Sequence, residues 1–155
     1  MTQQKLLPEA KTYEVEIIYK RPVLSQLHKI VNTEEALELI RHFIDYEKID
    51  LKEFFWVIAL NQANYVVGIS EIGKGSPQGV LVSIIEVFQI LIKTNASAII
   101  IVHNHPSGNT NPSKEDIMVT MQIYKGAKLL GALLVDHIII TKEDHFSFAE
   151  AEILK

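Results

Sequence analysis

The sequence contains no cysteine, which excludes a disulfide framework, a thiolate zinc site and a cysteine nucleophile. It also lacks a long apolar run, since stretches such as residues 98–102 are far shorter than the roughly 20 residues of a membrane-spanning helix. Residues 1–12 have no apolar centre of the kind that a secretory signal peptide needs. These absences lead us to expect a soluble protein of the cytoplasm, with no membrane partner.

An excess of basic residues is missing as well. The 15 lysines and arginines are outnumbered by 19 aspartates and glutamates, and the net charge is -4. Because nucleic-acid phosphates are bound chiefly by lysine and arginine, this balance disfavours a nucleic-acid surface spread over the whole protein. Lys20, Arg21 and Lys29 form a modest basic cluster, for which a solvated surface is favoured over a DNA contact.

The length of 155 residues fits one domain with its own core. We assign that domain to residues 31–155, after an N-terminal extension of residues 1–30 that contains one strand. Expected helices, opened by Asn32, Ser83 and Ser113, cover about residues 33–46, 83–93 and 113–126. Expected strands cover residues 13–19, 54–60, 65–72, 98–103, 131–140 and 146–148. The order β-α-β-β-α-β-α-β-β predicts an α/β or α+β fold, a mixed β-sheet flanked by helices.

The most informative stretch is residues 103–116, which follows the pattern H-x-H, seven residues, S-x-x-D. His103 and His105 end an expected strand, and side chains two apart on a strand share a face. Both imidazoles can therefore reach one ion, while Asn104 points away. Asp116 can supply a third ligand from the next helix. Two histidines and one carboxylate, with a fourth position open for water, are the ligand set of catalytic zinc.

Each of these features also has a purely structural explanation. Ser113 and Asp116 fit a helix cap, which contributes about 1 kcal/mol without any metal. A single histidine at a strand end is commonly a hydrogen-bonded structural residue. The pair favours a metal, because two histidines on one face would repel if protonated and would be costly to bury without a partner. The cap and the ligand are compatible, since a fixed helix start would hold Asp116 toward the strand end.

A hydrolytic zinc site also needs a general base, which is commonly a glutamate. Glu86 fits the capping box of its helix, and Glu71 ends a hairpin strand beside the glycine-rich loop of residues 73–79. Glu53 precedes an apolar strand, where desolvation would raise the pKa of its carboxyl group toward a useful value. The residues alone leave all three open and favour Glu53 slightly.

These residues resemble the JAMM, or MPN-plus, metallopeptidase domain, whose signature is an upstream glutamate, H-x-H, seven residues and S-x-x-D. The resemblance to its bacterial RadC-like branch is closer still and covers about residues 50–154. It is carried by residues 103–108, Pro112-Ser113 with Asp116, residues 136–139 and Ser147-Phe148. The resemblance implies the mixed sheet of the JAB/MPN, cytidine-deaminase-like architecture.

Position by position, the resemblance implies that His103, His105 and Asp116 bind Zn²⁺. It implies that Glu53 is the general base and then the acid, and that Ser113 stabilises the oxyanion. The implied activity is hydrolysis of amide bonds, peptide or isopeptide, in a protein or peptide substrate, with a link to DNA repair or mobile elements. Which amide is cut, and the oligomeric state, are not implied.

The sequence also departs from the family pattern. RadC-like chains carry an amino-terminal helix-hairpin-helix segment, whose glycine-rich hairpins residues 1–30 do not show, so contact with DNA is disfavoured. Residues 82–86 lack the Pro-Arg-Glu start expected for their helix. For His137 we favour a structural histidine, paired with Asp136 or with backbone, over a role beside the metal or in contact with the substrate. The rival functions are a non-catalytic metal-binding interaction module and a DNA-associated accessory protein.

Overall fold

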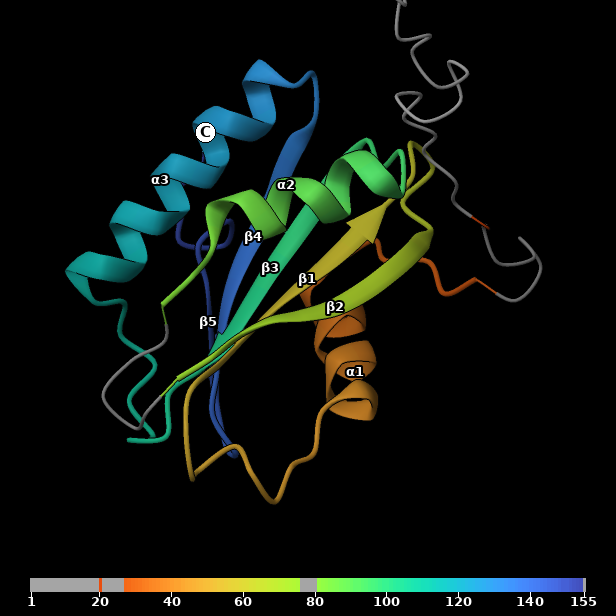
Figure 1. The fold of residues 1–155 in the computed structure, drawn as a ribbon. Coiled ribbons are helices and arrows are strands. Elements are labelled where there is room, and N and C mark those ends of the chain that lie inside the picture. The colour runs from red at the N-terminus through yellow and green to blue at the C-terminus, as the bar shows by residue number, and fades with distance from the viewer. Residues whose placement is uncertain (1–19, 21–26, 76–80, 155) are drawn as a thin grey trace, which may run out of the picture.

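Helices and strands alternate along the chain much as the hydrophobic pattern predicts (Figure 1). The structure, a computed structural model, describes residues 20, 27–75 and 81–154. The elements in these residues are α1 Thr33–Phe43, β1 Phe54–Leu60, β2 Val66–Lys74, α2 Ile84–Lys93, β3 Ala98–Asn104, α3 Lys114–Leu129, β4 Leu133–Ile140 and β5 His145–Ser147. The strand expected at residues 13–19 lies outside the described residues. None of the helices in the described part of the chain combines the length and hydropathy of a membrane span.

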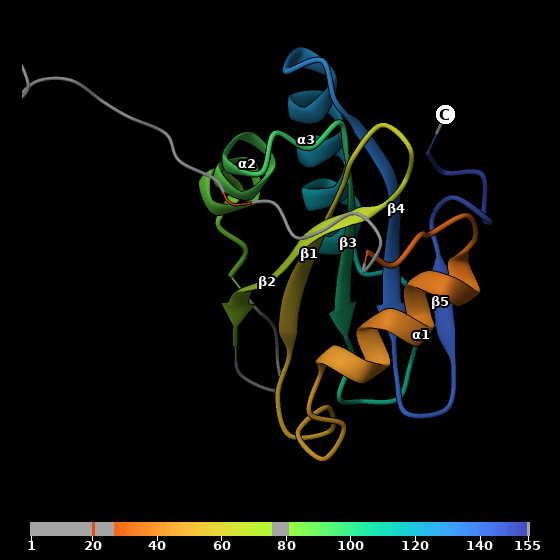
Figure 2. The same cartoon turned by 90° about the vertical axis from the view of Figure 1, so that its right-hand side faces the viewer.

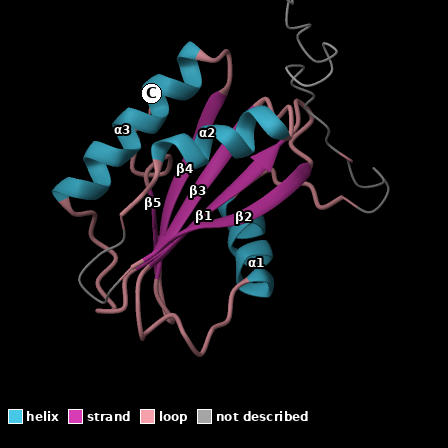
Figure 3. Ribbon diagram, in the orientation of Figure 1, coloured by secondary structure: helices cyan, strands magenta, loops and turns pink. Residues whose placement is uncertain are grey.

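The strands form one mixed sheet in the order β2-β1-β3-β4-β5 (Figure 3). β1 pairs antiparallel with both β2 and β3, and β4 pairs antiparallel with β5. β3 and β4 are parallel, and α3 makes the crossover between them. This arrangement confirms the predicted mixed sheet flanked by helices.

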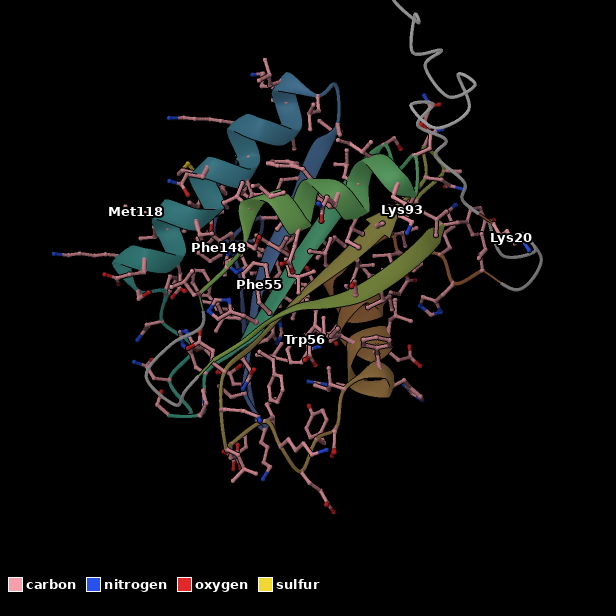
Figure 4. The ribbon with its side chains drawn as sticks, viewed as in Figure 1. Lys20, Phe55, Trp56, Lys93, Met118 and Phe148 are labelled. Carbon is pink, nitrogen blue, oxygen red and sulfur yellow. The ribbon has the colours of Figure 1, made fainter. Side chains whose placement is uncertain are left out.

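The sheet is covered on both faces, with α1 on one side and α2 and α3 on the other (Figure 2). Because side chains alternate along a strand, neighbouring residues of β1 enter different cores. Trp56 belongs to the core cluster that contains Leu37 and Ile40 of α1, whereas Phe55 belongs to the cluster that contains Val87 of α2. Figure 4 shows Trp56 on the α1 side of the sheet and Phe55 on the α2 side. All residues of β1 and β3 are buried, which explains why both read as continuous apolar runs.

Two predicted helix ends are wrong, for different reasons. α1 ends at Phe43 and not at residue 46, because Ile44 packs against the same core from extended backbone. α3 continues past Gly126 to Leu129. Gly126 is a point of close approach between α2 and α3, where an added Cβ would meet Cε2 of Phe88 at 2.7 Å. The residue that ends α3 is Gly131, whose φ of 73° suits a glycine after a helix.

The contact at Gly126 gives a stability prediction. Gly126→Ala gains about 1 kcal/mol in helix propensity but overpacks the α2–α3 contact, which costs about 1–3 kcal/mol, so we expect a net loss of stability in urea unfolding. In a Phe88→Leu background the ring is gone, and the same substitution should be neutral or stabilising. A Gly126→Ala protein that is more stable than the wild type with Phe88 in place would contradict this account.

Candidate metal centre

Three separate elements bring four acidic and imidazole side chains together at one end of the sheet. Glu53 immediately precedes β1, His103 lies near the end of β3 with His105 just beyond it, and Asp116 lies in the first turn of α3. The pairing of Phe55 with His103 places the start of β1 beside the end of β3. One ligand atom from each of the four residues lies within 4.8 Å of the others.

The distances in this cluster fit a tetrahedral metal ion. The Nε2 atoms of His103 and His105 are 2.9 Å apart. Oδ1 of Asp116 lies 3.1 Å from Nε2 of His103, and Oδ2 lies 3.4 Å from Nε2 of His105. Zinc ligands at about 2.0–2.1 Å in tetrahedral geometry are separated by roughly 3.3 Å. The N–N separation is shorter than this value and the two N–O separations are close to it, so the three side chains could hold one metal ion.

Glu53 lies slightly farther out than the other three residues. Its Oε1 is 3.9 Å from Nε2 of His103, and the residue is 9% exposed. Burial raises the pKa of the Glu53 carboxyl, a shift that His105 opposes and Asp116 reinforces. A carboxylate placed beside the ligand atoms, with a raised affinity for a proton, suits proton transfer.

The charges of the other three residues are strongly coupled. Burial opposes ionisation of Asp116, but its contacts with His103, His105 and Ser113 hold the pKa of this carboxyl well below its usual range. The hydrogen bond to Asp116 raises the pKa of His105. Burial lowers the pKa of the fully enclosed His103. A carboxyl group whose ionised form is favoured, next to an imidazole whose charged form is disfavoured by burial, suits a metal ion.

Ser113 caps α3 and is tied to Asp116 rather than lying free. Its Oγ accepts a hydrogen bond from the Asp116 N–H at 3.0 Å and donates to Asp116 Oδ2 at 2.6 Å. The Ser113 N–H also donates to Oδ2, at 2.7 Å. These bonds fix the carboxylate toward the two histidines. Cap and candidate ligand are thus combined in one motif, and the oxyanion role of Ser113 stays a prediction.

The other two candidate glutamates lie away from the cluster. Glu71 pairs in register with Trp56 and lines a groove with Phe43 and Ile44 of the α1 side. Glu86 is in the first turn of α2, with its N–H bonded to Ser83 Oγ. Of the three, the structure brings only Glu53 to the histidines.

Asn104, between the two histidines, has a role that the sequence did not reveal. Its side chain points to the α1 face, where Oδ1 accepts from the Phe54 N–H at 2.8 Å. Its Nδ2 donates to the carbonyls of Ile49 and Lys52, at 2.6 and 2.9 Å. The backbone on both sides of Glu53 is therefore held by the residue that separates His103 from His105. The H-x-H spacing shows only that Asn104 points away, not what it binds.

The partners predicted for His137, Asp136 or backbone, are wrong. His137 Nε2 lies 2.7 Å from Nδ1 of His103, a candidate ligand. Asp136 is bonded elsewhere, by Ser147 Oγ at 2.6 Å and the Ala149 N–H at 2.9 Å. His137 pairs in register with Ile101 on the neighbouring strand. A single sequence does not give the register between β3 and β4, so this contact had no sequence signal.

Comparison with known proteins gives the family. The profile described as the RadC-like JAB domain matches residues 30–153. A UPF0758 protein of Fusobacterium nucleatum is 41% identical over 152 residues, which cover 97% of this chain and 64% of the relative. One from Clostridium tetani is 41% identical over 127 residues, 82% of this chain and 54% of the relative. The chain belongs to the RadC-like JAB domain family, and it spans little more than half to almost two thirds of the length of these curated relatives.

The three hydrogen bonds between the Asn104 side chain and the backbone around Glu53, which we call the Asn104 clamp, can be tested by measuring stability. Asn104→Leu keeps a similar volume but removes three hydrogen bonds to the backbone, two of them buried, so we expect a loss of about 3 kcal/mol in the free energy of unfolding. Asn111→Leu, an equivalent change at an exposed asparagine near the same end, should have little effect. Equal urea midpoints for the two variants would show that the clamp does not stabilise the fold.

Proposed function

We propose that the protein is a zinc-dependent hydrolase of amide bonds, peptide or isopeptide, that acts on a protein or peptide substrate. The observation that carries this proposal is the placement of Glu53 beside two imidazoles and a carboxylate at metal-ligand spacing. His103, His105 and Asp116 would hold the ion. A bound Zn²⁺ would lower the pKa of a water molecule and polarise the scissile carbonyl.

The residues of the chain have separate tasks in this proposal. Glu53 takes a proton from the attacking water and returns it to the leaving nitrogen, so that the C–N bond breaks as the amine departs. The Ser113 hydroxyl turns from Asp116 to the developing oxyanion, while the Ser113 N–H keeps its bond to the carboxylate. Asn104 holds the backbone that carries Glu53.

A groove beside the cluster supports a polypeptide substrate. It has a volume of about 250 Å³, and Glu53, His103 and Asp116 form one part of its wall. Leu81, Val82, Met118 and Val119 line the rest of it together with Phe55, Glu115 and Gln122. Leu81 and Met118 are highly exposed for apolar side chains. An apolar wall next to the reacting centre suits an apolar side chain of a substrate peptide.

The proposal predicts different losses for two substitutions. His103→Ala removes a ligand, so both stoichiometric zinc and activity should be lost. Glu53→Gln should keep zinc but lower kcat at least about 100-fold, because proton transfer fails. Zinc is measured by metal analysis of protein purified without an affinity tag, and hydrolysis with a mixture of fluorogenic peptides and isopeptides.

Glu71→Gln is the matched control, since it changes the same chemistry on the opposite face of the sheet and should leave both readouts unchanged. A non-catalytic module would instead show no hydrolysis in the wild type. A protein without stoichiometric zinc that is also indifferent to His103→Ala would overturn the metal site itself.

We infer a polypeptide partner rather than DNA, because the net charge is -4 and the candidate groove is lined by acidic and apolar side chains. We therefore expect no binding to plain duplex DNA at low salt in a fluorescence anisotropy titration. Binding that weakens steeply with added salt would favour the DNA-associated accessory role.

A further inference from the structure

A chain of hydrogen bonds runs behind His103, on the side away from the cluster. His103 Nδ1 lies 2.7 Å from His137 Nε2, and His137 Nδ1 lies 2.5 Å from Thr120 Oγ1. Thr120 Oγ1 is in turn 2.5 Å from the backbone carbonyl of Asp116. The chain therefore starts at one candidate metal ligand and ends at the backbone of another.

The carbonyl of Asp116, at the end of this series of hydrogen bonds, determines which group donates in each of them. A carbonyl oxygen only accepts, so the Thr120 hydroxyl donates to Asp116 and its oxygen is left to accept from His137 Nδ1–H. A neutral imidazole has one N–H, so His137 Nε2 carries no proton and accepts from His103 Nδ1–H. His103 Nε2 is then the unprotonated nitrogen. That atom lies 2.9 Å from His105 Nε2 and 3.1 Å from Asp116 Oδ1, so its lone pair would be directed at an ion held by these residues.

The surroundings prevent water from replacing any partner in this chain. His137 and Thr120 are fully buried, and His103 is 1% exposed. The His137 ring stacks on Phe148 with centroids 4.7 Å apart and is tilted against Phe55 at 5.9 Å. Both aromatic rings are themselves almost fully buried, with Phe55 1% and Phe148 0% exposed. The ring is therefore held in one plane, with its two nitrogens directed at His103 and Thr120.

We propose that His137 and Thr120 are positioning residues that set the tautomer of His103 for metal binding. The pair keeps the proton on Nδ1 and the lone pair on Nε2, and Thr120 ties this choice to the turn of α3 that carries Asp116. The inference rests on the metal site of the proposed function, and it concerns binding of the ion, not hydrolysis. Outer partners of metal-binding histidines commonly fix their tautomer and contribute about 10- to 100-fold to metal affinity.

The test is the zinc affinity of Thr120→Val, measured by competition with a chromophoric chelator. Valine keeps the shape of threonine but removes the acceptor for His137 Nδ1–H. Without this acceptor, the proton of His137 is no longer held on Nδ1, so the tautomer of His103 is no longer fixed. We expect zinc to bind about 10- to 100-fold more weakly in Thr120→Val. Thr120→Ser, which restores the hydroxyl, should return the affinity to near the wild-type value.

Thr94→Val is the matched control. Thr94 Oγ1 also donates to a carbonyl four residues back, that of Ile90 at 2.8 Å, but the bond lies on α2 and contacts none of the candidate ligands. Its loss should leave zinc affinity unchanged. Equal affinities for Thr120→Val and Thr94→Val would overturn the proposal.

A second readout does not depend on any variant folding. In protein labelled with ¹⁵N-histidine, NMR should show His137 protonated on Nδ1 and unprotonated on Nε2. The opposite tautomer would overturn the proposal even if zinc binds tightly. A wild-type protein that took up no zinc would overturn the metal site. The protonation of the His137 ring nitrogens would still show which groups donate in the hydrogen bonds behind His103. Loss of hydrolysis alone would count only against the proposed reaction.

Discussion

Two imidazole nitrogens 2.9 Å apart, with a carboxylate beside both, are the constraint on which this end of the domain depends. Nitrogens that both carry lone pairs repel at this distance, and nitrogens that both carry protons clash. Burial strengthens either conflict, because little water is present to screen it. A single proton shared between the nitrogens would relieve the conflict, and so would a cation at the shared point, which would also balance the charge of Asp116. The three side chains could therefore hold a metal ion.

Such an arrangement persists only if each member is held from behind. Ser113 fixes the Asp116 carboxylate through the cap of α3, and His137 fixes the ring of His103. The carbonyl of Asn109 lies 2.6 Å from Nδ1 of His105. Neighbouring residues at the end of β3 thus have roles on opposite faces of the sheet. His103 faces α3, while Asn104 holds the backbone around Glu53 from the α1 side.

The sequence predicted the fold and the candidate site to different depths. Strands β1 and β3 were readable because residues buried on both faces form unbroken apolar runs, and the helix starts were readable from Asn32, Ser83 and Ser113. The end of α3 was not, because Gly126 serves a contact with Phe88 that lies far from it in sequence. A pattern of residues 103–116 named three of the four clustered side chains, since their spacing is local.

The fourth clustered residue, Glu53, and the contacts behind the site depend on strand register. Glu53 was chosen by its place before an apolar strand and by family resemblance. The pairing that brings it to His103 is a property of the β1–β3 ladder. The same holds for His137, whose neighbour on β3 is Ile101. Register arises from how two apolar faces pack, and one sequence leaves several registers equally apolar.

The two buried polar side chains behind His103 raise the question of why these core positions are not apolar. Thr120 and His137 lie among apolar residues, where a valine and a phenylalanine would fill similar volumes. Buried polar groups cost desolvation, and apolar replacements that fill the same space are often neutral or stabilising. An apolar pair would therefore also be compatible with a stable core. The proposed positioning role gives a reason for a hydroxyl and an imidazole here, because each donor then meets one acceptor and the last acceptor is a backbone carbonyl that cannot donate.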